Sequence, residues 1–170
     1  MGIYSVDKLM AETRRIAAEY RRTMGKSLGG VSGEIAIHDA CRLLDLEAVT
    51  GNAQGGYDAV GRGDREGKRV QVKGRAIFDE GKSGQRIGQL KVDQEWDSVV
   101  LVLMDDNFEP VELYEAERAE VLEALEDSGA SKRAKRGAMS VAKFKNIGRM
   151  VWNSTEGLVD DEIWDNRGQG

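Results

Sequence analysis

Alternating apolar and polar positions in residues 56–75 predict a β-hairpin. In the segment KRVQVKGR, Val70 and Val72 fall on one face of a strand, and Gln71 and Lys73 fall on the other. The preceding run GYDAVGR supplies the partner strand, and the polar segment GDREG, closed by glycines, supplies the turn. Because opposite residues of antiparallel strands point to the same side, Asp58 is expected to lie across from residues 71–73.

Helical spacing of apolar residues predicts two helices before this hairpin. The first begins at Ser5 and ends near Met24. Its other face carries Arg14, Arg15, Arg21 and Arg22. These side chains could contact phosphates, but a solvated surface is the better explanation for this face. The second helix runs from about residue 32 to 44 and buries Ile37 and Cys41. Glu34 falls on that inward face, where a carboxylate needs a partner, and a cation beside Asp58 would serve.

Further elements follow on both sides of the clearest strand, residues 98–104, which is apolar on both faces as a central strand would be. We expect short strands at 47–50 and 110–114, a partly mobile loop and then a short helix at 86–94, and a helix at 117–127. Ser140 is a candidate cap for a last helix that buries Val141, Phe144, Ile147 and Val151.

These elements predict one domain of the α/β class (α+β), with a central mixed β-sheet flanked by helices. The expected order is α-α-β-β-β-(α)-β-β-α-α. The N-terminal helix and loop take residues 1–30, the core 31–127, a basic loop and C-terminal helix 128–153, and an acidic tail 154–170.

Composition fits a globular protein, with 40% apolar and 32% charged residues among 170. A single cysteine excludes an intramolecular disulfide and fits a reducing compartment. Residues 1–10 lack the apolar stretch of a signal peptide, and the longest apolar run is too short to span a bilayer. We therefore expect a cytoplasmic protein without a membrane partner. The net charge of −5 argues against DNA at first, but local patches decide binding.

The motifs follow one another in the order of a helix with Glu34, a strand with Asp58 and a strand with Gln71-Val72-Lys73. In this order the sequence resembles the PD-(D/E)XK nuclease superfamily, which includes restriction endonucleases and junction resolvases. The resemblance covers roughly residues 32–125. It implies a restriction-endonuclease-like core and a divalent-metal-dependent DNA endonuclease. Asp58 matches the metal-binding aspartate of the family, Lys73 its lysine, and Glu34 a helix glutamate that many members use as a further metal or water ligand.

Two residues depart from the family pattern. Tyr57 stands where the family has proline, and Gln71 stands where it usually has Glu or Asp. A glutamine carbonyl can bind a hard cation but brings no charge. Glutamine at this place resembles the branch of restriction enzymes that cut modified DNA.

The resemblance also implies roles for the catalytic set Glu34, Asp58, Gln71 and Lys73. Asp58 and the carbonyls of Gln71 and Val72 would hold Mg²⁺ or Mn²⁺, and Glu34 would orient a water or help to bind a second ion. Lys73 would polarise the attacking water or stabilise developing negative charge. Products would carry 5′-phosphate and 3′-hydroxyl ends. A symmetric homodimer is expected, since restriction-type nucleases usually dimerise to cut both strands.

Basic residues after these motifs are candidates for DNA binding. The first group consists of Arg75, Lys82, Arg86 and Lys91. Scattered positions on the protein surface explain this group nearly as well as DNA binding does. Residues 128–150 carry seven cations and no acid, and include Lys132, Arg133, Lys135 and Arg136. A solvated loop and helix explains this second group equally well.

Two other functions stay open. Gln71 favours a nucleic-acid-binding module on the same fold that has lost catalysis. The acidic helix at 117–127 and the net charge favour a protein-interaction domain.

Overall fold

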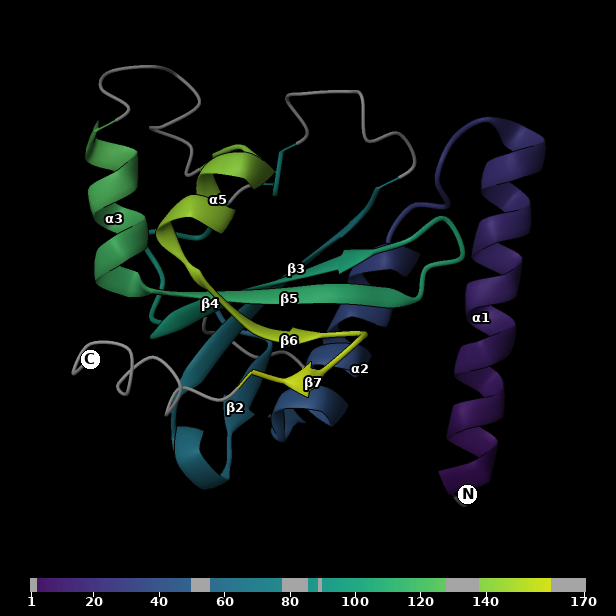
Figure 1. Ribbon diagram of the computed structural model, residues 1–170, viewed down its shortest axis with the longest axis horizontal. Coiled ribbons are helices and arrows are strands. Elements are labelled where there is room, and N and C mark those ends of the chain that lie inside the picture. The colour runs from purple at the N-terminus through teal and green to yellow at the C-terminus, as the bar shows by residue number, and fades with distance from the viewer. Residues whose placement is uncertain (1–2, 50–55, 78–85, 89, 128–137, 160–170) are drawn as a thin grey trace.

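A mixed sheet of seven strands lies at the centre of the protein, in a computed structural model that describes residues 3–49, 56–77, 86–88, 90–127 and 138–159 (Figure 1). The strands lie in the sheet in their chain order. They are β1 (Leu46–Ala48), β2 (Ala59–Gly61), β3 (Arg69–Ala76), β4 (Ser98–Met104), β5 (Pro110–Glu117), β6 (Arg149–Asn153) and β7 (Gly157–Leu158). Only the β3–β4 pair is parallel.

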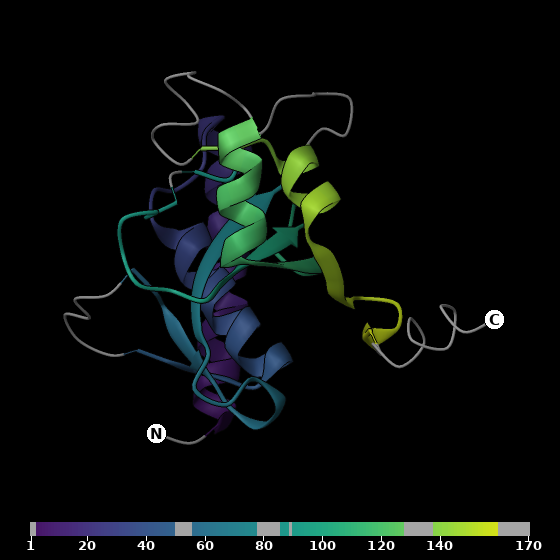
Figure 2. The ribbon, with the colours of Figure 1, turned by 90° about the vertical axis from the view of Figure 1, so that its left-hand side faces the viewer.

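Helices cover both faces of the sheet. They are α1 (Ile3–Met24), α2 (Val31–Leu44), α3 (Arg118–Asp127) and α5 (Val141–Ile147). The first two pack on the face that carries Val100 and Val102 of β4. The other two lie side by side and pack on the face that carries Val99 and Leu101 (Figure 2). Because strand side chains alternate between faces, β4 serves two cores and all seven of its residues are buried.

The predicted hairpin is confirmed. β2 and β3 pair antiparallel, with Ala59 opposite Val70 and Val60 opposite Arg69. A short 3₁₀ turn, η1 (Gly63–Arg65), connects them. The glycines on either side of the predicted turn, Gly63 and Gly67, have φ of 57° and 76°, a conformation that glycine adopts without strain.

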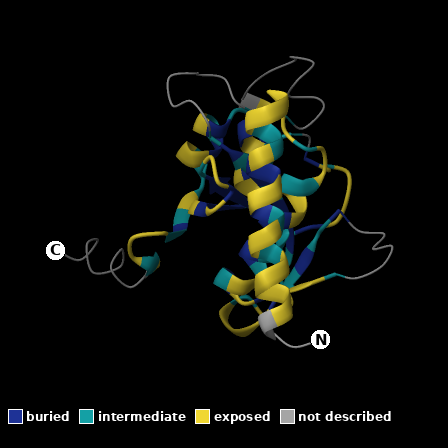
Figure 3. Cartoon of the chain, turned by 90° about the vertical axis from the view of Figure 1, so that its right-hand side faces the viewer, coloured by how far each residue is buried: buried dark blue, intermediate teal, exposed yellow. Residues whose placement is uncertain are grey.

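A buried ion pair holds α1 against the rest of the domain. Arg14 is 6% exposed. Its Nη1 donates to Oδ2 of Asp39 on α2 at 2.9 Å, and also to the carbonyl of Phe108 in the β4–β5 turn at 2.5 Å. The prediction that Arg14 lies on a solvated face is wrong, because its partner comes from a second helix. Much of α1 is exposed (Figure 3), including Val6 and Leu9, two of the apolar residues whose helical spacing predicts this helix.

Three predicted elements differ from the structure. Residues 86–88 and 90–94 form no helix; Arg118 instead binds the carbonyls of Val92, Gln94 and Trp96, and so holds this segment in an irregular path. The capped helix begins after Ser140 as predicted but ends at Ile147.

Val151, predicted on that helix, lies in β6 instead. Residues 154–159, predicted as the start of an acidic tail, form a turn and β7. The α+β class with a mixed sheet between helices is confirmed. None of the helices in the described part of the chain is long and apolar enough to cross a bilayer.

Candidate active site

Most of the predicted site residues meet at one open cavity of about 310 Å³. We call it the hairpin cleft. The predicted residues that line it are Glu34, Asp58, Gln71, Val72, Lys73, Arg75 and Lys91. They come from the first turn of α2, from the residue directly before β2, from β3 and from the connection between β3 and β4. Residues far apart in the sequence are therefore brought to one place.

The cleft exists because β2 is shorter than β3. The two strands pair only from Ala59 to Val60, so beyond Val70 no described strand borders β3 on that side. The beginning of α2 approaches this free edge at Gly74. A Cβ at position 74 would lie 2.5 Å from Cβ of Ala36 and 3.0 Å from the carbonyl oxygen of Ser32. Glycine at position 74 therefore allows the helix to come this close.

Asp58 is fixed at the point where β2 leaves β3. Its backbone N–H donates to the carbonyl of Val70 at 2.8 Å, and its Oδ2 accepts from the backbone N–H of Val72 at 2.8 Å. The predicted position of Asp58, across from residues 71–73, is confirmed. The side-chain bond replaces a strand-to-strand bond and orients the carboxylate at the cleft.

Lys73 is half-buried at the cleft. Burial lowers the pKa of its ammonium group, Asp58 raises it, and Lys91 and Arg75 lower it further. Among the described residues no carboxylate lies within 4.0 Å of this ammonium. Asp58 thus influences Lys73 electrostatically without neutralising it in a direct ion pair.

Gln71 is 2% exposed and connects three segments. Its Nε2 donates to the carbonyl of Gly56 at 2.8 Å, and its Oε1 accepts from the backbone N–H of Lys91 at 3.3 Å. A glutamate at position 71 could accept the second bond but could not donate the first. The amide oxygen has a second lone pair, so its predicted role as a metal ligand stays a prediction.

Glu34 lies at the mouth of the cleft. It is exposed, so the prediction that it faces inward is wrong. It belongs to the first turn of α2, and its exposed carboxylate stays in contact with solvent. The helix begins at Val31, and its N-cap residue, Gly30, provides no side-chain cap. Its first backbone N–H groups therefore provide positive partial charge beside the cleft.

The other predicted DNA-binding residues are divided. Arg75 is half-buried; its Nε donates to the carbonyl of Arg86 and its Nη1 to the carbonyl of Gly74 at 2.5 Å. Arg86 contributes this carbonyl, but its side chain does not line the cleft. Lys91 is exposed at the cleft. The remaining predicted residues lie outside the described part of the chain: Lys82, Lys132, Arg133, Lys135 and Arg136.

The donors at the cleft suit a hard divalent cation. Within the described ranges, no group of three or more His, Cys, Asp or Glu side chains could hold a metal. Asp58 and Glu34 are the two carboxylates among the described residues that line the cleft. Mg²⁺ is commonly bound through one or two carboxylates and keeps several waters. These residues fit that manner of binding.

Sequence reasoning missed the glycine-rich wall of the cleft, formed by Gly30, Gly33, Gly56 and Gly88. The available signal was the group of glycines just before α2, since glycines before a helix often allow a ligand to approach its N-terminus. Comparison of the sequence with protein-family models and with curated proteins finds no match.

Proposed function

We propose that this protein is a divalent-metal-dependent endonuclease that hydrolyses phosphodiester bonds in DNA. The observation that carries the proposal is that Asp58, directly before β2, and Lys73 on β3 line one cleft of a single hairpin. Their order, after a helix with Glu34, is that of the nuclease motif they resemble.

Each cleft residue has a chemical task in this proposal. Asp58 and Glu34 would hold Mg²⁺ or Mn²⁺, with the carbonyl oxygens of Gln71 and Val72 as neutral donors. When bound, such a cation stabilises negative charge on phosphoryl oxygens and makes water a nucleophile at neutral pH. Lys73 holds the attacking water and stabilises the charge that develops on the phosphate. The positive end of α2 favours the phosphodiester anion at the same place.

A second candidate function is a nucleic-acid-binding module without catalysis. Gln71 favours it, because both ends of its amide already bind the backbone of Gly56 and Lys91. With Gln71 in this structural role, Asp58 and Glu34 are the charged donors that remain among the described residues of the cleft.

Cleavage of supercoiled plasmid with Mg²⁺ or Mn²⁺ tests the proposal, with modified and unmodified DNA. Wild type is compared with Lys73→Ala and with Lys8→Ala, a matched control at an exposed position of α1. We expect cutting by wild type and Lys8→Ala but not by Lys73→Ala. Linearisation would indicate two sites, as in a homodimer, whereas nicking alone needs one.

The other outcomes are equally informative. Equal cutting by Lys73→Ala would place the chemistry elsewhere. Absence of cutting, with DNA binding that weakens as salt rises, would favour the binding module. Absence of both cutting and binding would contradict both functions.

A further inference from the structure

A second cavity, of about 460 Å³, adjoins the hairpin cleft. We call it the basic pocket, and define it by Arg21, Lys26, Ser27, Ser32 and Arg75. It shares Ser32, Gly74 and Arg75 with the cleft. Among the described residues that line it there are three cations and no Asp or Glu. The hairpin cleft, by contrast, has two carboxylates, so the two cavities differ in the charge that they present.

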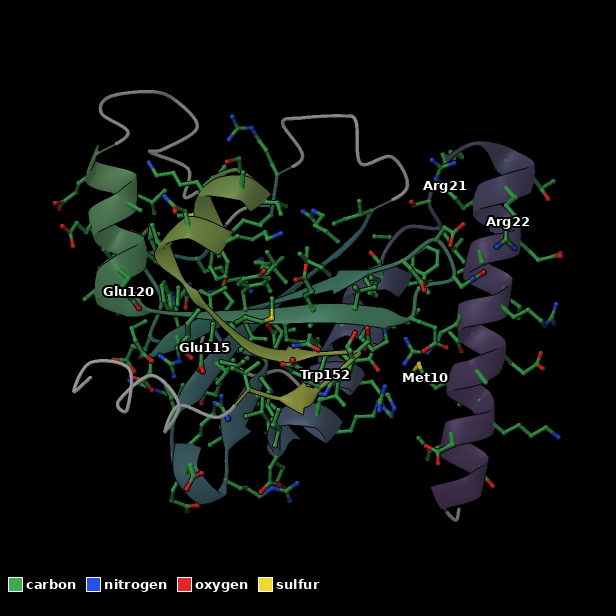
Figure 4. The ribbon with its side chains drawn as sticks, viewed as in Figure 1. Met10, Arg21, Arg22, Glu115, Glu120 and Trp152 are labelled. Atoms are coloured by element: carbon green, nitrogen blue, oxygen red, sulfur yellow. The ribbon has the colours of Figure 1, made fainter. Side chains whose placement is uncertain are left out.

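The end of α1 builds one wall of the basic pocket. Arg21 extends from the last turn of this helix toward the rest of the domain (Figure 4). The N–H of Gly25 donates to the carbonyl of Arg21 at 3.0 Å, and Gly25 has φ of 73°. This left-handed residue ends the helix and turns the chain, so that Lys26 and Ser27 line the pocket together with Arg21.

Arg75 lines both cavities. Its guanidinium is half-buried and donates to the carbonyls of Arg86 and Gly74. Within the described residues it has no carboxylate partner within 4.0 Å, and burial lowers its pKa. A partly buried cation without an anionic partner is costly, and an anion that enters the pocket would offset this cost.

We propose that the basic pocket binds a phosphate group, and that in the nucleic-acid complex it holds the backbone phosphate next to the one in the hairpin cleft. The second part rests on the proposed function. Lys73 and Arg75 are two residues apart on β3, which places their backbones about 7 Å apart along the strand. Successive phosphates of one nucleic-acid strand can bridge such a spacing. Bound DNA would then run along the free edge of β3, from the cleft toward the end of α1.

The first test uses inorganic phosphate as the probe, because it needs no nucleic acid. Thermal unfolding is followed with phosphate and with chloride at equal ionic strength. We expect phosphate to raise the melting temperature of wild type and of Lys8→Glu, but to have little effect on Lys26→Glu. Lys26 is exposed, as is Lys8, so both variants should fold and both change the net charge equally. An equal phosphate effect on the two variants would overturn the pocket.

The second test measures binding of a short DNA duplex in EDTA, so that cutting plays no part. Lys26→Glu should bind about 10-fold more weakly than Lys8→Glu, and its affinity should depend less steeply on salt, by about one unit of slope. Equal affinities and slopes would overturn the DNA part of the proposal. Weaker binding by Lys26→Glu in a protein that never cuts plasmid would support the basic pocket while refuting the nuclease.

Discussion

The carboxylate of Asp58 accepts a hydrogen bond of 2.8 Å from the backbone N–H of Val72. Val72 lies on β3 directly before Lys73, so the bond fixes the carboxylate of Asp58 relative to the strand that carries Lys73. One carboxylate oxygen is engaged in this bond. Asp58 thus has two separable properties, a hydrogen-bond acceptor that supports the hairpin and a negative charge at the cleft.

Substitution of Asp58 should separate these two properties. Asp58→Asn keeps an acceptor for the N–H of Val72, so its free energy of unfolding should stay within about 0.5 kcal/mol of wild type. Asp58→Ala leaves that N–H without its partner and should cost about 1–3 kcal/mol. Both variants lose the charge and should lose metal-dependent plasmid cutting. Urea unfolding and the plasmid assay check these expectations. Equal destabilisation by Asn and Ala would show that the hydrogen bond is not what Asp58 contributes to stability.

Replacement of Lys73 by methionine should stabilise the protein at neutral pH. Burial holds the pKa of Lys73 below its ordinary value of 10.5 in the folded state. The folded protein therefore binds this proton less readily than the unfolded chain does, and the cost is fully present below the folded pKa. It disappears as pH rises from the folded pKa to about 10.5. The advantage of Lys73→Met in urea unfolding should accordingly shrink as the pH rises toward 10.5. An advantage that is independent of pH, or one that Lys8→Met shares, would contradict this explanation.

Gln71 should be more important for stability than its place in the motif suggests. Gln71→Leu leaves the carbonyl of Gly56 and the N–H of Lys91 without their side-chain partner, at about 1–3 kcal/mol for each unsatisfied group. Gln71→Glu keeps the acceptor but loses the donor, so we expect it to melt below wild type without metal. Mg²⁺ should then raise its melting temperature more than that of wild type, because it adds a carboxylate at the cleft.

The matched control for this change of charge is Gln94→Glu at an exposed position. Its melting temperature should respond to Mg²⁺ as wild type does. If Gln71→Glu is as stable as wild type without metal, the hydrogen bond from Gln71 to the carbonyl of Gly56 contributes nothing to the stability of the fold.

The ion pair between Arg14 and Asp39 should behave as a buried pair. Arg14→Met leaves the buried Asp39 with Arg42 at 3.1 Å as its ion-pair partner, and Asp39→Leu leaves the buried Arg14 with Glu109 at 3.6 Å. Because these second partners compensate in part, each single change should cost up to about 3–5 kcal/mol. The double variant removes both charges and should regain a large part of that loss. A double-mutant cycle by urea unfolding measures the coupling. Additive losses would show that the two side chains do not stabilise one another, whereas Arg15→Met at an exposed position should have little effect.

The local pattern of apolar and polar residues was sufficient to predict features that depend on a single strand or a single hairpin. β4 occupies residues 98–104 as predicted, because every position in it is apolar or small. The meeting of Asp58 with Lys73 follows from hairpin register alone, which the alternation around Val70 and Val72 determines.

Features that depend on packing between distant segments were not predictable in this way. Helical periodicity gives the direction of Glu34 around its helix axis but not which other elements cover the first turn of the helix, so its exposure was missed. Arg14 is buried because Asp39 lies opposite it on another helix, 25 residues away. β6 has five residues, and its central Val151 continues the spacing of α5, so strand and helix could not be distinguished there.

The order of strands in the sheet bears on how the chain folds. Each strand pairs with its neighbours in the sequence, the edge strands β1 and β7 with one and the others with two, so the sheet can grow by adding strands one after another. Contacts between segments close in sequence form early, because they require little loop closure. The contact from Arg14 to the carbonyl of Phe108 spans 94 residues and needs the β4–β5 turn to be in place. We therefore expect α1 to dock last. Since the end of this helix builds one wall of the basic pocket, that pocket would be completed only in the final step of folding.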